Sequence, residues 1–173
     1  MLTHLPFYFW CSMREQIRSQ IDILISVLTV SLTVILDRAT KIFFSKILAI
    51  GDTIAVIPDV FHFTLVHNTG MAFGLFKDHG IVFIIIPIIA IALLVYNIYY
   101  YRENERLSRG YIFAFSLILG GAIGNLIDRI YMGYVIDFLD FRIWPVFNIA
   151  DSVITIGAVI ILIQCIPLSF KEK

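Results

Sequence analysis

Long apolar runs separated by short polar stretches dominate the chain, and four of them are candidates for membrane-spanning helices. A helix of roughly 20 residues crosses a hydrocarbon core of about 30 Å. The four expected spans are residues 23–44, 81–101, 110–128 and 151–170. The first run is free of charge only as far as Leu36, which is too short, so we expect its helix to continue to Phe44. Asp37 and Lys41 then lie four residues apart on one helical face, where they can pair.

Between the first two apolar runs the pattern changes to the alternation that is typical of β-strands. Residues 53–57 and 60–66 are rich in β-branched and aromatic side chains, and Asp59 between them suits a turn. Residues 141–144 alternate in the same way. We therefore predict a small β-sheet that rests on the membrane surface.

The composition indicates an α-helical integral membrane protein. Of 173 residues, 60% are hydrophobic and 15% are charged, against about 25% charged in soluble domains. We expect one membrane domain, residues 21–173, after an N-terminal cytoplasmic tail, residues 1–20; alternatively, Met13 is the true start. The formal net charge is zero, so nothing predicts nucleic acid as a partner. Cys11 and Cys165 lie near opposite ends of the chain and predict no disulfide.

Four spans place both termini on one side of the membrane. That side then holds seven of the 13 basic residues but only five of the 13 acidic ones. Basic residues are enriched in cytoplasmic loops, so we place the termini in the cytoplasm. In the third span, Gly120 and Gly124 form a small-residue face that permits close helix packing.

This topology gathers the ionisable groups at the outer end of the bundle. Asp37 and Lys41 close the first span, Asp128 and Arg129 close the third, and Asp151 opens the fourth. The polar stretch 67–70 lies in the first outer loop. A purely structural protein has little use for so many charged groups at a single membrane face.

Asp137 and Asp151 are the strongest candidates for chemistry. Each has apolar neighbours in sequence, and ionising a carboxyl in such a setting is costly. Two carboxyls that share one proton can activate a water, as in aspartic proteases, and need no metal. His62 and His67 match no metal-ligand spacing, so we expect neither a metal nor another cofactor.

Each of these residues also has a structural alternative. Asp151 could cap the fourth helix, and Asp137 could be an ordinary loop acid. Asn68 and Gly70 could form only a turn. Asp37 and Lys41 could form an ordinary ion pair at the membrane border. In the third span, Asn125 and Asp128 share a helical face and suit a hydrogen-bonded brace.

The two candidate aspartates differ in their expected protonation. Asp151 lies at the start of a predicted helix, where free N–H groups and the helix dipole favour a negative charge. Asp137 lacks this support and lies between Ile136 and Phe138. We therefore expect Asp151 to be mainly the carboxylate and Asp137 to hold the shared proton.

Five motifs in order give the chain its resemblance to the lipoprotein signal peptidases, or signal peptidase II, which are membrane aspartyl proteases of bacteria. The resemblance covers residues 22–168, and its motifs are Asp37–Lys41, Asn68–Gly74, Gly120–Arg129, Val135–Phe138 and Phe147–Ser152. Two departures are Met71, where a small residue is usual, and the short segment between Asp137 and Asp151.

The resemblance implies a fold, a reaction and a set of site residues. The fold is four transmembrane helices with a small extracytoplasmic β-cradle, in the bacterial inner membrane. The enzyme, expected to be a monomer, cuts diacylglyceryl-modified prolipoproteins on the amino side of the lipidated cysteine, beside membrane lipid, and globomycin inhibits it. The catalytic dyad is Asp137 and Asp151. The supporting residues are Asp37, Lys41, Asn68, Gly70, Asn125, Asp128, Arg129, Asn148 and Ala150.

Two other functions remain as alternatives. A small proton-coupled transporter also uses intramembrane acids, but it places them near the bilayer midplane on broken helices. A membrane subunit without enzyme activity would not need two acids flanked by apolar residues. Cleavage of a diacylglyceryl-prolipoprotein peptide by the purified protein distinguishes the three.

Overall fold

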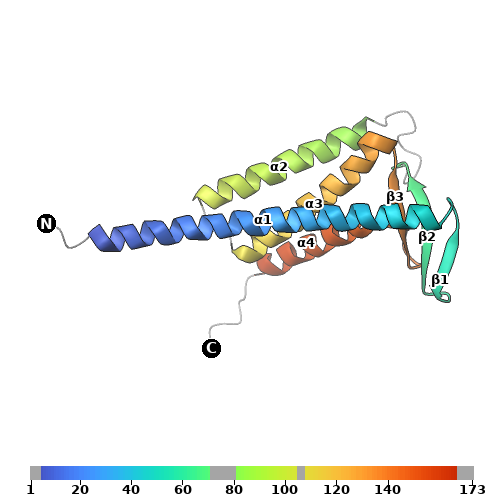
Figure 1. Cartoon of the computed structure of the whole chain (residues 1–173), viewed down its shortest axis with the longest axis horizontal. Coiled ribbons are helices and arrows are strands. Elements are labelled where there is room, and N and C mark those ends of the chain that lie inside the picture. The colour runs from blue at the N-terminus through green and yellow to red at the C-terminus, as the bar shows by residue number, and fades with distance from the viewer. Residues whose placement is uncertain (1–4, 71–80, 105–107, 167–173) are drawn as a thin grey trace.

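The computed structural model describes residues 5–70, 81–104 and 108–166, and Figure 1 shows their arrangement. Four helices and three strands follow one another within these described residues. They are α1 (Leu5–Ile47), β1 (Thr53–Ile57), β2 (Phe61–Asn68), α2 (Val82–Asn104), α3 (Arg109–Met132), β3 (Val135–Asp140) and α4 (Ile149–Cys165). Met71 to Gly74 of the second motif and the end of the fourth expected span lie outside the described residues.

The helices run alternately in opposite directions, and the sheet stands across one end of the bundle (Figure 1). α3 contacts α1, α2 and α4, so it is the central helix. The start of α1 and the end of α4 lie at the end of the bundle away from the sheet. The sheet end therefore receives the C-terminal turns of α1 and α3 and the first turn of α4.

The first helix is longer than predicted. α1 begins at Leu5 rather than at residue 23, because residues 13–22 favour helix and contain no Gly or Pro that would end it. At its other end α1 continues past Asp37 and Lys41 to Ile47, as the short apolar run required. With 43 residues it is about 65 Å long, so it extends well beyond a hydrocarbon core of about 30 Å.

The sheet is antiparallel throughout, with the order β1-β2-β3. Its first two strands confirm the predicted hairpin, and Asp59 occupies the turn with a left-handed φ of 59°. One face of the sheet packs on the end of α1 through a cluster of Phe44, Leu65 and Phe138. The rings of Phe44 and Phe138 stack with their centroids 4.4 Å apart.

The third strand was predicted at the wrong place. Residues 141–144 form a bend instead, in which Arg142 has a left-handed φ of 65° and Asp140 accepts its backbone N–H at 2.8 Å. The strand is β3, whose residues are buried on both faces. A strand covered on both faces shows no apolar–polar alternation, which is why the sequence pattern did not reveal it.

Isoleucine and leucine side chains cover the outer faces of the helices instead of being buried between them. Exposed examples are Leu24, Leu28 and Leu32 on α1, Ile86 on α2 and Leu162 on α4. Among the described residues, the stretches long and apolar enough to cross a membrane are Ser12–Ile47 and Arg109–Met132; shorter apolar helices are Ile84–Tyr100 and Ile149–Cys165. Such faces are unfavourable in water and suit a lipid environment.

Close packing of α3 depends on its glycines. A Cβ at Gly124 would lie 2.7 Å from Asp37 Oδ2 of α1, and Gly120 faces α1 in the same way. A Cβ at Gly121 would lie 2.5 Å from the carbonyl oxygen of Ala150 in α4. The predicted small-residue face is thus confirmed, and Gly121 adds a second close contact on another side of α3.

We predict that Gly121→Ala destabilises the protein strongly, because the clash is with the backbone of α4 and only a shift of a whole helix relieves it. A loss of at least about 2 kcal/mol in unfolding free energy is expected from such overpacking. Gly110→Ala in the same helix is the control, since its new Cβ would meet only the movable end of Gln164. Thermal unfolding in detergent should separate the two variants; equal midpoints would contradict the helix contact.

Candidate active site

Lys41 lies at the centre of the polar residues at the sheet end, and its side chain is fully buried. Its Nζ lies 2.8 Å from Asp37 Oδ2, 2.9 Å from Asp128 Oδ2 and 3.0 Å from Asn125 Oδ1. An ammonium has three N–H donors, so these contacts use all of them. The predicted Asp37–Lys41 pair is confirmed, and it is one part of a larger buried network that joins α1 to α3.

The two carboxylates around Lys41 also hold the other elements in place. Asp128 accepts the guanidinium of Arg38 and, at 3.2 Å, the backbone N–H of Ile136 in β3. Asp37 Oδ1 accepts the backbone N–H of Ala150 in the first turn of α4 at 3.1 Å. The network therefore fixes the strand and the helix that carry Asp137 and Asp151.

Two asparagines connect the lysine to the candidate dyad. Asn125 Oδ1 accepts from Lys41, so its Nδ2 points away and donates to Asp151 Oδ1 at 2.8 Å. Asn148 Nδ2 donates to Asp137 Oδ1 at 2.6 Å and also lies 3.0 Å from Asn125 Oδ1. Each amide thus presents an N–H group to one carboxyl of the pair.

Asp151 does cap the fourth helix, as its structural alternative predicted, and it also lies beside Asp137. Asn148 is the N-cap of α4: its Oδ1 accepts the N–H of Asp151 at 3.0 Å, and Asp151 Oδ2 accepts the N–H of Asn148 at 3.3 Å. Because Asn148 contacts both carboxyls, the capping box brings Asp151 next to Asp137.

Asn68 and Gly70 form a turn that directs the Asn68 side chain toward Asp137. Asn68 Oδ1 accepts the N–H of Gly70 at 2.9 Å, and Gly70 has a left-handed φ of 80°. This turn fixes the amide, so that Asn68 Nδ2 donates to Asp137 Oδ2 at 2.9 Å. The predicted turn is therefore part of the site. Asp137 accepts an amide N–H on each of its two carboxyl oxygens.

Burial raises the pKa of Asp137 from 3.8 to about 6. This value is a net result: the negative charge of Asp151 also raises the pKa, while the amides of Asn68 and Asn148 and the charge of Lys41 lower it. The burial of Asp137, which is 2% exposed, thus exceeds the effect of its hydrogen bonds. This supports the expectation that Asp137 holds the shared proton.

Arg129 supplies a positive charge near the pair. Its guanidinium interacts electrostatically with Asp151, Asp137 and Asp128. This positive charge is opposite in sign to that of an ionised carboxyl in the pair. With Arg129, every residue predicted for the site from the sequence belongs to one connected set.

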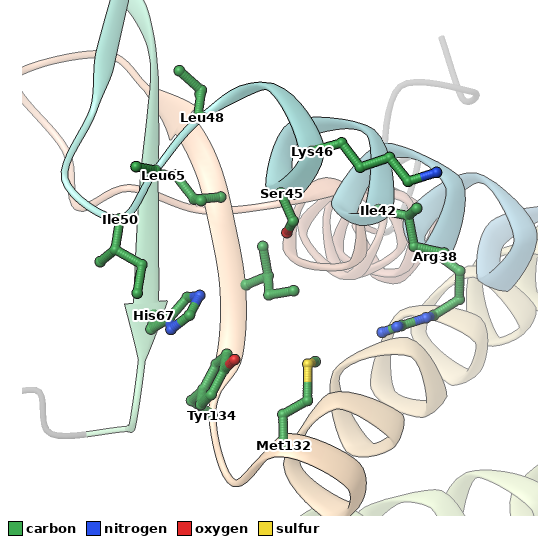
Figure 2. Close-up of a pocket in the computed structure, with 12 residues that line it drawn as sticks. Arg38, Ile42, Ser45, Lys46, Leu48, Ile50, Leu65, His67, Met132 and Tyr134 are labelled. Carbon is green, nitrogen blue, oxygen red and sulfur yellow. The ribbon is translucent and has the colours of Figure 1, made fainter.

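Figure 2 shows the residues around a cavity between the end of α1 and the sheet, and this cavity has a volume of about 520 Å³. Arg38 and Lys46 of α1, His67 of β2 and Tyr134 after α3 line it. His67 pairs with Ile136 in the sheet register, whereas Asp137 pairs with Val66. Neighbouring residues of a strand point to opposite faces, so this cavity does not contain the dyad.

The two histidines have structural surroundings. The ring of His67 stacks on Tyr134 with centroids 3.9 Å apart, and His62 is buried opposite Asp140 in the sheet. Within the described residues, no three His, Cys, Asp or Glu side chains are grouped so that they could hold a metal ion.

The contact between Arg38 and Asp128 was not predicted from the sequence. These residues lie 90 positions apart, and no local pattern connects them. A basic residue inside an apolar helix, next to Asp37, was the available signal that Arg38 has a buried partner. The backbone N–H of Ile136 and the double contact of Asn148 were missed because they depend on the tertiary fold.

The fold is similar to that of a bacterial membrane enzyme. One solved structure of a bacterial membrane enzyme, determined by the in meso method at 2.3 Å resolution, aligns with a TM-score of 0.74 and 37% identity, covering 86% of this chain and 92% of the other. A second one aligns with a TM-score of 0.75 and 36% identity, covering 83% and 94%.

The profile of the signal peptidase (SPase) II family matches residues 29–167. A lipoprotein signal peptidase of Halothermothrix orenii is 44% identical over 136 residues, which cover 79% of this chain and 91% of the relative. One from Clostridium tetani is 40% identical over 142 residues, covering 79% and 89%. The chain therefore belongs to the signal peptidase II family.

We predict that Lys41→Met destabilises the fold by about 3–5 kcal/mol, because Asp37 and Asp128 lose the cation they share in a buried site. The matched control is Lys46→Met, an exposed lysine of the same helix, which should change stability by no more than about 0.5 kcal/mol. Thermal unfolding in detergent measures both. A shift in Lys41→Met as small as the control would contradict the central role of this lysine.

Proposed function

We propose that this protein is an aspartic endopeptidase that removes the signal peptide from diacylglyceryl-modified bacterial prolipoproteins. The cut falls on the amino side of the lipidated cysteine, and globomycin blocks it. The observation that carries the proposal is the pair Asp137 and Asp151, both held by Asn148. Membership of the signal peptidase II family supports the substrate.

The chemistry requires an activated water and a protonated leaving nitrogen. The ionised Asp151 removes a proton from a water, whose oxygen attacks the scissile carbonyl carbon, while protonated Asp137 donates its proton to the carbonyl oxygen. When the tetrahedral intermediate collapses, Asp151 gives its proton to the leaving nitrogen and Asp137 takes its own proton back. The pair returns to its starting state, so neither a metal nor another cofactor is needed.

The asymmetry required by this mechanism has a physical basis in the surroundings of the two carboxyls. Asp151 lies in the first turn of α4, where the helix dipole and the free N–H groups favour a negative charge. Asp137 lies on a buried strand, and burial raises its pKa to about 6, so it holds a proton more readily than an ordinary carboxyl does. The fixed amides of Asn68, Asn125 and Asn148 orient both groups.

In the proposed topology the four helices span the bacterial inner membrane, and both termini are cytoplasmic. The sheet then forms an extracytoplasmic cradle at headgroup depth. The exposed leucines and isoleucines of the helices face lipid, and the diacylglyceryl tails of the substrate remain in the bilayer while the peptide reaches the dyad. The carboxyl pair and its supporting residues all come from one chain, so a monomer suffices.

The alternative functions fit the geometry less well. A proton-coupled transporter would need its acids near the middle of the helices. Here Asp37 lies in the last third of α1, Asp128 lies about one turn before the end of α3, Asp151 lies in the first turn of α4, and Asp137 lies outside the helices. A subunit without activity gives no reason for a buried carboxyl whose pKa is raised to about 6.

We predict that Asp137→Asn and Asp151→Asn each reduce cleavage of a diacylglyceryl-prolipoprotein peptide by about 100-fold or more. The double variant should be no worse than either single one, because the groups act as a unit. Asp140→Asn is the control. It removes a buried carboxyl of the same strand, but this carboxyl accepts hydrogen bonds from Thr64 and Arg142 and does not contact the dyad. Retention of a tenth of the activity by either dyad variant, with unfolding temperatures unchanged, would rule out the assignment.

The pKa of Asp137 predicts the pH dependence of cleavage. A raised pKa keeps the acid protonated below about pH 6, and the proton is lost as the pH rises through that value. Since the mechanism needs this proton, kcat/KM should fall on the alkaline side with an apparent pKa of about 6, tenfold per pH unit well above it. Steady-state kinetics with the lipidated peptide measure the profile. A kcat/KM that stays constant or increases between pH 6 and 8 would contradict Asp137 as the acid.

A further inference from the structure

The end of the bundle away from the sheet carries a second group of charged side chains, which the proposed reaction does not use. Arg14 and Arg18 lie four residues apart on one face of α1, and Arg109 begins α3. The three arginines line one hollow of about 610 Å³ between the two helices. All three are exposed, so their guanidinium groups are available to a ligand.

The hollow has an excess of positive charge. Among the described acidic side chains, Asp22 is the one that reaches it: Asp22 Oδ1 lies 3.5 Å from Arg109 Nε. Asp22 is 6% exposed and holds Arg109 against α1, so it offsets one of the three positive charges. Three guanidinium groups with one such carboxylate leave a site that suits an anion, and arginine binds phosphate through two parallel N–H groups.

An apolar crevice adjoins the cationic hollow. It has a volume of about 180 Å³ and is lined by Ile23, Ser26, Val27, Ile98 and Ile112, together with Asp22. The pair of Asp22 and Arg109 lies where the two spaces meet, since Asp22 lines one and Arg109 the other. Ile17 and Ile21, which are 50% and 38% exposed, continue the apolar surface beside the arginines.

We propose that this seam between α1 and α3 binds an anionic glycerophospholipid, with its phosphate on Arg14, Arg18 and Arg109 and an acyl chain in the crevice. A cationic space that continues into an apolar one matches the order of groups in such a lipid. The proposal rests on the membrane topology proposed above, in which this end of the bundle lies at the cytoplasmic leaflet. A bound lipid would fasten α1 to α3 at the end opposite the dyad.

The test measures lipid retention by the purified full-length protein in detergent, using native mass spectrometry with phosphatidylglycerol and phosphatidylcholine of the same acyl chains. We expect the protein to retain phosphatidylglycerol preferentially. Arg14→Gln and Arg18→Gln should each lower its occupancy constant about fivefold, since each cation near a lipid surface contributes about a factor of five. Val27→Trp, which fills the crevice without changing charge, should lower the retention of the lipid as well.

Lys46→Gln is the matched control, because it removes one exposed cation from the same helix at the cavity of Figure 2. It should leave retention unchanged. An equal loss in Lys46→Gln, no preference between the two lipids, or full retention in the Arg14→Gln/Arg18→Gln double variant would each overturn the proposal. Displacement of the lipid by inorganic phosphate, with no effect of Val27→Trp, would show a free-anion site and overturn it too.

Cleavage by the same samples separates this inference from the proposed function. The arginine variants do not alter the dyad or its supporting residues, so in detergent they should cleave the lipidated peptide at the wild-type rate. Unfolding temperatures with and without phosphatidylglycerol give a second readout, since a ligand that binds the folded state raises its stability. Wild-type protein should gain stability from the lipid, and the double variant should not.

Discussion

The burial of one ammonium group, that of Lys41, is the constraint on which the rest of the site depends. A charge without exposed surface must have partners for each donor, and Lys41 finds them on its own helix and on α3. Its partners Asp37 and Asp128 then use their remaining oxygen positions to hold the backbone of α4 and of β3. The relative position of Asp137 and Asp151 is therefore set by the requirement to satisfy a lysine that contacts neither of them.

The four acids at this end divide into two pairs with different surroundings. Asp37 and Asp128 form ion pairs with the cations Lys41 and Arg38. Asp137 and Asp151 bond instead to amides, which are neutral and orient a carboxyl without supplying a full charge. Asn125 and Asn148 thus lie between an ion-pair network that stabilises the fold and the carboxyl pair that is proposed to exchange a proton.

Sequence reasoning succeeded where the determining contacts are local. The spacing of Asp37 and Lys41, the turn at Asp59 and the glycines of α3 all follow from short-range patterns, and the structure confirms them. The position of β3 was predicted wrongly because this strand is buried on both faces. The start of α1 was predicted wrongly because the charged tail is also a good helix former. The motifs identified which residues belong to the site. The hydrogen bonds and ion pairs that join these residues depend on contacts between distant segments, such as that of Arg38 with Asp128.

The capping box of α4 explains how a stabilising motif and a reactive group can share one residue. A cap requires Asp151 to stay near the N–H of Asn148, and this contact is long, at 3.3 Å, while the bond from Asn125 is 2.8 Å. The helix terminus favours a negative charge on Asp151, and the buried strand favours a neutral Asp137. In the proposed mechanism, this difference between a helix end and a strand interior is what distinguishes two chemically identical side chains as base and acid before any substrate binds.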